Sequence, residues 1–255
     1  MELNFALTLL VGMFVGGAAG YLGCFMILKR MALVGDAMTH VALPGMGIAI
    51  LLGINPFIGA LVFLIFASFT VFKIENKTKL PTEALIGIFF TFSLALGILI
   101  TPETELLEAL FGEISKTNIF DGISAIIFAI LSFIVIHKIE KNLILGTISE
   151  DLAKSTGVNT NRMNLTFLLL VTIIVAIGVK VVGTLLMGAL VIIPAVSAKN
   201  ISKNLSGYTK WGIVFGVISA VLGLVLTKIT SLSPGPLVVM SSMLIFVLSL
   251  TFRNK

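Results

Sequence analysis

The stretch Ile123-Ser-Ala-Ile-Ile-Phe-Ala-Ile-Leu-Ser-Phe-Ile-Val-Ile136 carries no charge and shows no alternation between apolar and polar positions. A membrane-spanning β-strand would alternate in polarity over roughly 10 residues, so this stretch predicts an α-helix instead. A helix also satisfies all its backbone hydrogen-bonding groups internally, as the interior of a bilayer requires. The stretch therefore predicts an all-α, polytopic membrane protein.

Similar apolar runs fill most of the chain, which is 58% hydrophobic and only 11% charged. Soluble domains carry about 25% charged residues. Because about 20 residues cross the hydrocarbon core, we expect spans near 5–28, 32–53, 57–72, 84–101, 119–137, 164–179, 183–198, 211–229 and 235–252. The run at 57–72 is short, and only Lys180 and Gly183 break 164–198, so the count is eight or nine.

The longest polar stretch, residues 138–164, is too short to bury a core of its own. Residues 1–255 are therefore expected to form a single transmembrane domain, and the chain is not expected to be an enzyme. The small-residue spacing of Gly12, Gly16 and Gly20 in the first span predicts close packing against another helix.

Lysine and arginine cluster on the cytoplasmic side of membrane proteins. With the N-terminus outside and the C-terminus in the cytoplasm, fourteen basic residues lie inside and three outside, the three being Lys116, Lys180 and Lys228. The net charge of +5 is then a consequence of topology, and a nucleic-acid partner is not expected. The outer side would carry an acidic loop with Glu103, Glu105, Glu108 and Glu113.

Asp36 and His40 are the ionisable residues that stand out inside a predicted span. A charged side chain at the centre of a membrane costs roughly 2.5–3.5 kcal/mol even on insertion scales, which favours a functional role. Residues four apart share one face of a helix, and a carboxylate with an imidazole suits borderline divalent cations. A hydrogen-bonded packing pair and a proton relay are the alternatives. Pro44-Gly45 predicts a kink beside the pair.

Two further ionisable residues lie at predicted span ends. Glu83 follows Pro81-Thr82 and is either a helix-start residue, favoured by the helix dipole, or a third metal ligand. His137, beside Lys138, is expected to be an interfacial residue.

Several segments together resemble one family. The run Met31-Ala-Leu-Val-Gly-Asp36-Ala-Met-Thr-His40-Val-Ala-Leu-Pro44-Gly resembles the signature of zinc- and manganese-type permeases of ATP-binding-cassette importers. Four more segments agree in order: Leu51 to Ala60, Glu83 to Ile88, Leu110 to Glu113, and Val182 to Lys199. One departure is Ile148-Ser-Glu150-Asp151, where the family usually has a segment that contains proline. Downstream of it, Ala153 and Gly157 stand at the positions expected from the family pattern.

The resemblance implies a homodimer in the plasma (inner) membrane of a prokaryote, with a central path for Zn, Mn or Fe(II) and no permanently bound cofactor. It also implies cytoplasmic ATPase subunits that hold ATP and an extracytoplasmic metal-binding protein. A short cytoplasmic coupling helix would span Pro194 to Leu205 and include Ala195, Ala198 and Lys199. The four glutamates of the acidic loop would face the binding protein.

Three rival functions make different predictions. A permease for a siderophore or cobalamin would need a wide path without Asp36 and His40. A proton-coupled secondary metal transporter would work without an ATPase. An intramembrane metalloprotease would need a motif such as His-Glu-x-x-His, whereas the two histidines here are His40 and His137. The residue types do not show whether the cargo is Zn, Mn or Fe. They also do not show whether Asp36 and His40 bind the ion or gate its path.

Overall fold

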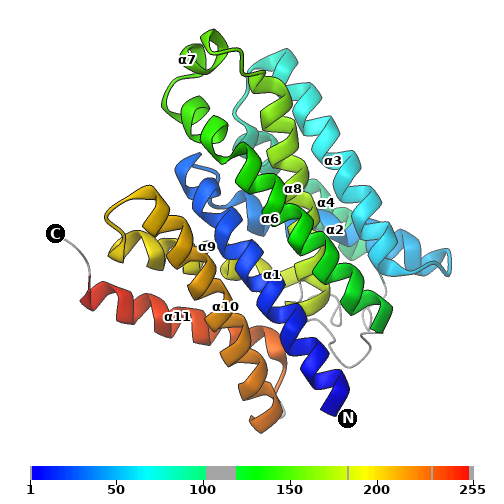
Figure 1. Cartoon of the computed structure of the whole chain (residues 1–255). Coiled ribbons are helices and arrows are strands. Elements are labelled where there is room, and N and C mark those ends of the chain that lie inside the picture. Colours follow the sequence, from blue (N-terminus) through cyan, green and yellow to red (C-terminus); the bar gives the residue numbers. More distant parts are fainter. Residues whose placement is uncertain (1, 102–118, 183, 231, 253–255) are drawn as a thin grey trace.

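The computed structural model describes residues 2–101, 119–182, 184–230 and 232–252, and the regular secondary structure in these ranges is helical (Figure 1). The helices are α1 (Glu2–Leu28), α2 (Val34–Leu51), α3 (Pro56–Thr78), α4 (Thr82–Ile100), α6 (Ile119–Ile148), α7 (Glu150–Ser155), α8 (Thr160–Val182), α9 (Thr184–Ile201), α10 (Leu205–Thr230) and α11 (Pro234–Thr251). In these ranges eight helices are long and apolar enough to cross a membrane, and α9 contributes a shorter apolar stretch, Met187–Ile201. The predicted all-α fold of eight or nine spans is confirmed.

Local sequence accounts for where several helices begin and end. Asn55 caps α3, since its side chain accepts a hydrogen bond from the Phe57 amide, and Pro56 occupies the first helical position. Ser149 caps α7 by accepting from the Leu152 amide, so the segment that departs from the family pattern still forms an ordered short helix. Gly157 follows that helix with φ of +83°, a conformation that favours glycine.

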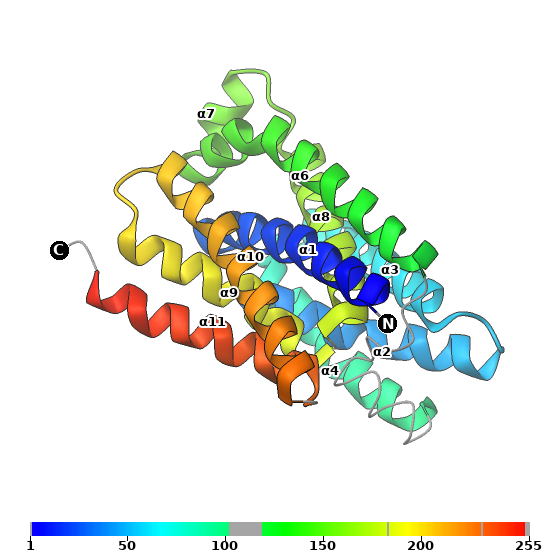
Figure 2. The same cartoon turned by 60° about the horizontal axis from the view of Figure 1, so that its bottom comes forward.

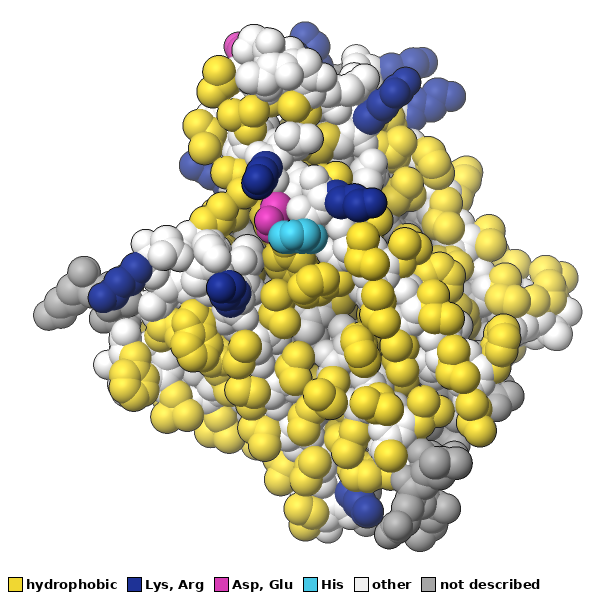
Figure 3. All heavy atoms as spheres, viewed as in Figure 1, with side chains coloured by type: hydrophobic (Ala, Val, Ile, Leu, Met, Phe, Trp, Pro, Cys, Tyr) yellow, Lys and Arg dark blue, Asp and Glu magenta, His cyan; other side chains and the backbone are white. Residues whose placement is uncertain are grey.

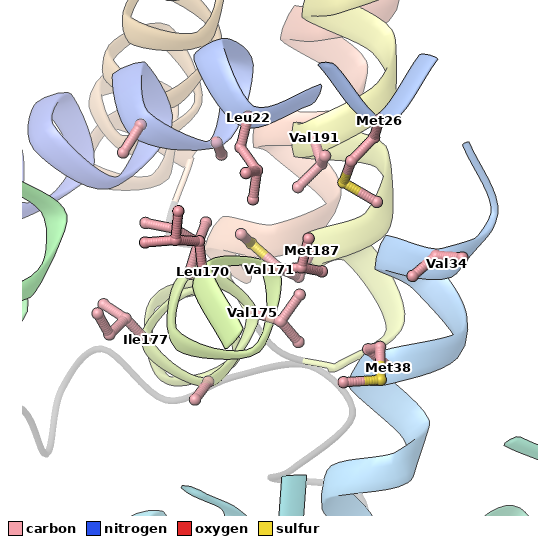
Figure 4. Close-up of a cluster of buried hydrophobic side chains, with 14 of the residues drawn as sticks. Leu22, Met26, Val34, Met38, Leu170, Val171, Val175, Ile177, Met187 and Val191 are labelled. Atoms are coloured by element: carbon pink, nitrogen blue, oxygen red, sulfur yellow. The ribbon is translucent and has the colours of Figure 1, made fainter. Parts of the chain in front are cut away.

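The bundle has two groups of three helices joined by α1 and α8 (Figures 1 and 2). Helices α2, α3 and α4 pack on one another, as do α9, α10 and α11. Helix α1 contacts α6, α8, α9 and α10, whereas α8 contacts α2, α3, α6 and α9. Figure 4 shows where the groups meet, with buried side chains of α1, α2, α8 and α9 turned toward one another: Leu22, Met26, Val34, Met38, Leu170, Val171, Val175, Ile177, Met187 and Val191.

Glycines let several helices touch through their backbones. A Cβ atom at Gly16 would lie 2.5 Å from the carbonyl oxygen of Gly216, and one at Gly20 would overlap that of Gly212. Gly45 and Gly59 oppose each other in the same way between α2 and α3. The predicted close packing of the first span is confirmed, with α10 as its partner.

Basic side chains gather at one end of the bundle, which we call the basic end. It contains the segment after α1, the C-terminal parts of α3 and α6, helix α7, the start of α8, and the end of α9 with the start of α10: Lys29, Arg30, Lys73, Lys77, Lys79, Lys138, Lys141, Lys154, Arg162, Lys199, Lys203 and Lys210. Figure 3 shows most blue side chains toward this end and a largely apolar surface below it. Lys228 belongs to the other end, with its Nζ 4.5 Å from the centroid of the Phe5 ring. This distribution agrees with a membrane-embedded belt between two polar ends.

Candidate functional site

Helix α2 carries both Asp36 and His40. Asp36 lies in the first turn, where the helix dipole favours an anion, and its backbone carbonyl accepts a 2.6 Å hydrogen bond from the Thr39 hydroxyl. Its side chain is half-buried, whereas His40 is only 9% exposed. The two side chains project from the same face because they are four residues apart. The helix therefore holds a carboxylate and an imidazole next to each other inside the bundle.

The His40 ring lies against α4. Its centroid is 5.2 Å from that of Phe90, in an edge-to-face arrangement. The Nδ1 atom is buried, and no hydrogen-bond partner for it occurs among the described residues. Leaving a buried polar atom unpaired costs about 1–3 kcal/mol, and a neutral imidazole nitrogen is a common metal ligand. The geometry leaves one nitrogen of His40 available to a ligand that enters the site.

Pro44 removes one backbone hydrogen-bond donor near the imidazole. It lies inside α2 and has no N–H, so it cannot donate to the carbonyl of residue 40, four positions earlier. The next residue, Gly45, lets α3 approach closely. The helix is thus weakened one turn beyond His40, as expected for a segment that lines a polar path.

Asp36 lies against α9 at Gly188. A Cβ atom at Gly188 would be 2.6 Å from both the Cβ and Oδ1 atoms of Asp36, and 2.7 Å from its Cα. Only glycine allows this separation between α2 and α9. Gly188 and Phe90 were not identified as site residues from the sequence. A lone glycine within an apolar span was the available signal for Gly188, whereas Phe90 is one aromatic residue among many.

Glu83 occupies a different position from the pair. It is exposed in the first turn of α4, two residues after Pro81 at the N-cap. It lines a polar cavity of about 330 Å³ at the basic end, together with Lys29, Arg30, Met31, Glu75, Pro81, Thr82, Asn164, Phe167 and Leu168. Asp36 and His40 do not line this cavity. Among the described residues no three His, Cys, Asp or Glu side chains gather into a possible metal site, so one chain presents the α2 pair without Glu83.

Lys29 is a half-buried cation that lines this cavity. Its Nζ donates to Asn164 Oδ1 at 2.9 Å and lies 5.7 Å from the centroid of the Phe167 ring. Burial lowers the pKa of Lys29, while the charges of Glu75 and Glu150 act in the opposite direction. Lys29 therefore ties the end of α1 to α8 through its hydrogen bond to Asn164.

The predicted coupling residues lie in the second half of α9. Pro194 is inside this helix, which continues to Ile201, so the short helix expected from Pro194 to Leu205 is continuous with the apolar segment before it. Ala195 and Ala198 are fully buried in a small cluster with Cys24 and Tyr208, whereas Lys199 is exposed. The predicted docking residues Glu103, Glu105, Glu108 and Glu113 lie outside the described residues.

A helical membrane bundle with a half-buried carboxylate beside a buried imidazole on a weakened helix defines a protein of the membrane-transport class. The chain belongs to the ABC 3 transport family, whose model matches residues 3–253. The resemblance seen in the sequence motifs is thereby confirmed.

Individual relatives match over nearly the full length. The chain is 34% identical to the manganese import system permease protein ScaB of Streptococcus gordonii, over 97% of this chain and 91% of the relative. It is 30% identical to the high-affinity zinc uptake system membrane protein ZnuB of Haemophilus influenzae, over 97% of each. Among solved structures, PsaBC from Streptococcus pneumoniae in complex with Fab matches with a TM-score of 0.82 and 30% identity, over 95% of this chain and 89% of that one.

Proposed function

We propose that this chain is the permease subunit of an ATP-driven importer of divalent metal ions, with Zn, Mn or Fe(II) as cargo. The observation that carries the proposal is the pair on α2, in which the buried, unpartnered Nδ1 of His40 lies one helical turn from the half-buried Asp36 carboxylate. Relatives named for manganese and for zinc transport support this class of cargo. The imidazole supplies a nitrogen ligand and the carboxylate neutralises charge.

The working unit is proposed to be a homodimer. One chain presents two adjacent candidate ligands, whereas closed metal sites commonly use four. Because the pair lies inside its own bundle, against α4 and α9, water would fill the remaining coordination positions in each chain while the ion passes. Glu83, at the basic end of α4, would then act as a later contact for the ion or only as a helix-start residue.

Helix α9 is proposed to couple the ATPases to the pair. Its Gly188 touches Asp36, and its second half reaches the basic end with Pro194, Ala195, Ala198 and Lys199. Eleven residues separate Gly188 from Lys199, which corresponds to about 16 Å of helix. Movement imposed at the basic end would therefore shift the helix surface against which Asp36 packs, and this shift would open the path on alternate sides.

The basic end is proposed to be cytoplasmic, which follows from the excess of lysine and arginine there. ATP would be hydrolysed by separate ATP-binding-cassette subunits docked at this end. The opposite end, with the loop that carries Glu103, Glu105, Glu108 and Glu113, would receive the ion from an extracytoplasmic binding protein. The N-terminus would lie outside and the C-terminus inside the plasma membrane of a prokaryote.

The proposal is tested by Asp36→Ala and His40→Ala in the complex reconstituted into proteoliposomes, with radioactive Mn or Zn as the cargo. We expect uptake to fall at least tenfold while membrane insertion and ATPase binding are retained. Ser241→Ala on α11 is the control, because this buried hydroxyl bonds only within its own helix, to the Leu237 carbonyl. Uptake at the normal rate in either α2 variant would remove the site from the proposal.

The same vesicles separate this function from a proton-coupled carrier. An ATP-driven importer copurifies with an ATP-binding subunit and transports only with ATP. Uptake driven by a pH gradient in vesicles that contain this chain alone would support the carrier instead.

A further inference from the structure

Three polar side chains meet where α1 and α6 cross near the basic end, and we call them the junction cluster: Tyr21, His137 and Glu140. The Tyr21 hydroxyl donates to Glu140 Oε2 at 2.5 Å. Glu140 Oε1 lies 3.2 Å from His137 Nδ1, and the Tyr21 oxygen is 3.5 Å from the same nitrogen. The cluster is on a different face of the bundle from Asp36 and His40, because α6 does not contact α2 closely.

His137 and Glu140 are spaced like two ligands of one metal ion. Zn²⁺ binds imidazole nitrogen and carboxylate oxygen at about 2.0–2.2 Å, so at the tetrahedral angle two such ligand atoms lie roughly 3.3–3.6 Å apart. The observed separation of 3.2 Å is just below this range, so a small movement of the exposed imidazole would admit an ion. Metal sites in helix bundles use a carboxylate and an imidazole three residues apart in the order Glu-x-x-His, and His137 and Glu140 have the same spacing in the reverse order. The ion could enter without rearrangement of the backbone.

Exposure differs sharply between the two ligands, in a way that suits an open site. The His137 side chain is 70% exposed and that of Glu140 is 21% exposed. In the tautomer with its proton on Nε2, the imidazole would offer the Nδ1 lone pair to an ion. Water would fill the remaining coordination positions.

Tyr21 fixes the Glu140 carboxylate from behind. It is only 3% exposed, and its ring packs against Phe25 and Phe133 with centroid distances of 5.5 and 4.8 Å. Its hydroxyl bonds Oε2, which leaves Oε1 directed at His137. Hydrogen bonds to ligating carboxylates are the usual means by which proteins orient such ligands.

We propose that the junction cluster is a second site for borderline divalent cations, with His137 and Glu140 as ligands and Tyr21 as the positioning residue. Lys138 and Lys141, exposed on the same helix, oppose cation binding, so the site fills only when the ion is abundant. It lies toward the basic end, the side on which the proposed function releases its cargo. On that basis the site senses imported metal and slows further import, because an ion on His137 and Glu140 would hold Glu140 of α6 in its contact with Tyr21 of α1, the helix that leads into α2.

Binding is tested on the purified full-length chain in detergent, in a background with both Asp36→Ala and His40→Ala so that the transport pair cannot contribute. Titration with Zn²⁺ alone, and with Co²⁺ followed by its visible absorption, is expected to show one site per chain. His137→Ala and Glu140→Gln should each abolish it, and Tyr21→Phe should weaken it about 10–100-fold.

The matched control is Tyr208→Phe, the same change at the other tyrosine, which is buried and donates to the Cys24 carbonyl. It should bind as the background does. Monodisperse elution shows that each variant is folded. Equal Zn²⁺ binding with and without His137 and Glu140, or no binding in the background, would overturn the site, and neither result depends on whether the chain transports metal.

Sensing is tested in proteoliposomes that contain the complete transporter with the transport pair intact. Metal preloaded on the ATPase side should lower the initial uptake rate of the wild type several-fold and leave the His137→Ala, Glu140→Gln variant unaffected. An equal slowing of both proteins would show that the cluster has no part in feedback.

Discussion

Replacing Gly188 by alanine tests whether the contact between α9 and α2 sets the position of Asp36. The new Cβ would lie 2.6 Å from the Cβ and Oδ1 atoms of Asp36, whereas unstrained carbon contacts begin near 3.5 Å. The two helices would have to separate by roughly 0.9 Å. Such overpacking costs about 1–3 kcal/mol, and the better helix propensity of alanine recovers up to about 1 kcal/mol.

The expected loss of stability is therefore small, but the expected loss of transport is large. Metal–ligand distances are defined to about 0.2 Å, so the displacement exceeds the tolerance of a coordination site several-fold. We expect Gly188→Ala to fold and to assemble with its partners, while uptake of radioactive Mn or Zn falls at least tenfold.

The matched control is Gly17→Ala on α1, where the new Cβ would meet only the end of the Val217 side chain at 3.1 Å and that of Ile213 at 3.6 Å. This variant should transport at close to the normal rate. If Gly188→Ala imports metal as fast as Gly17→Ala, Asp36 does not need the position that α9 gives it, and the coupling argument fails.

Three further changes test the packing and the charges around the site. Gly20→Ala should lower the melting temperature in detergent, with a cost of about 1–3 kcal/mol, because its Cβ would overlap the Gly212 carbonyl; an unchanged melting temperature would contradict this. Ser68 and Thr172 share a buried 2.6 Å hydrogen bond between α3 and α8. A double-mutant cycle with Ser68→Ala and Thr172→Val should therefore show a coupling energy of about 0.6 kcal/mol. A coupling energy of zero would mean that this hydrogen bond does not stabilise the fold. Burial lowers the pKa of Lys29 below 10.5, so the unfolded chain binds its proton more tightly than the folded protein does. The stability of the wild type relative to Lys29→Met should therefore increase as pH rises through that lowered pKa, and a pH-independent difference would refute it.

Hydropathy and charge were sufficient to predict the helices, since each span is a local property of the chain. The boundaries were less accurate where charges lie on a helix that continues out of the membrane. Helix α3 was expected to end near residue 72 but reaches Thr78, and α6 was expected to end at 137 but reaches Ile148. Hydropathy marks the membrane boundary, whereas hydrogen bonding continues past it.

Which helices are neighbours could not be predicted from periodicity. The four-residue spacing placed Asp36 beside His40, because that relation lies within one helix. The contacts of Asp36 with Gly188, of His40 with Phe90, and of Tyr21 with Glu140 join segments far apart in the chain. His137 was interpreted only as an interfacial residue, since its partner Tyr21 lies 116 positions away.

The glycine contacts between helices also limit how this protein can change over generations. At Gly16 with Gly216, and at Gly45 with Gly59, each residue of the pair faces the backbone of the other. When a side chain appears on one member, no substitution of its partner can make room, because the partner is already the smallest residue. Ordinary protein cores diverge through pairs of compensating mutations. Such pairs cannot occur at these glycine positions. Ancestral and descendant chains would share this glycine framework while the side chains around it vary.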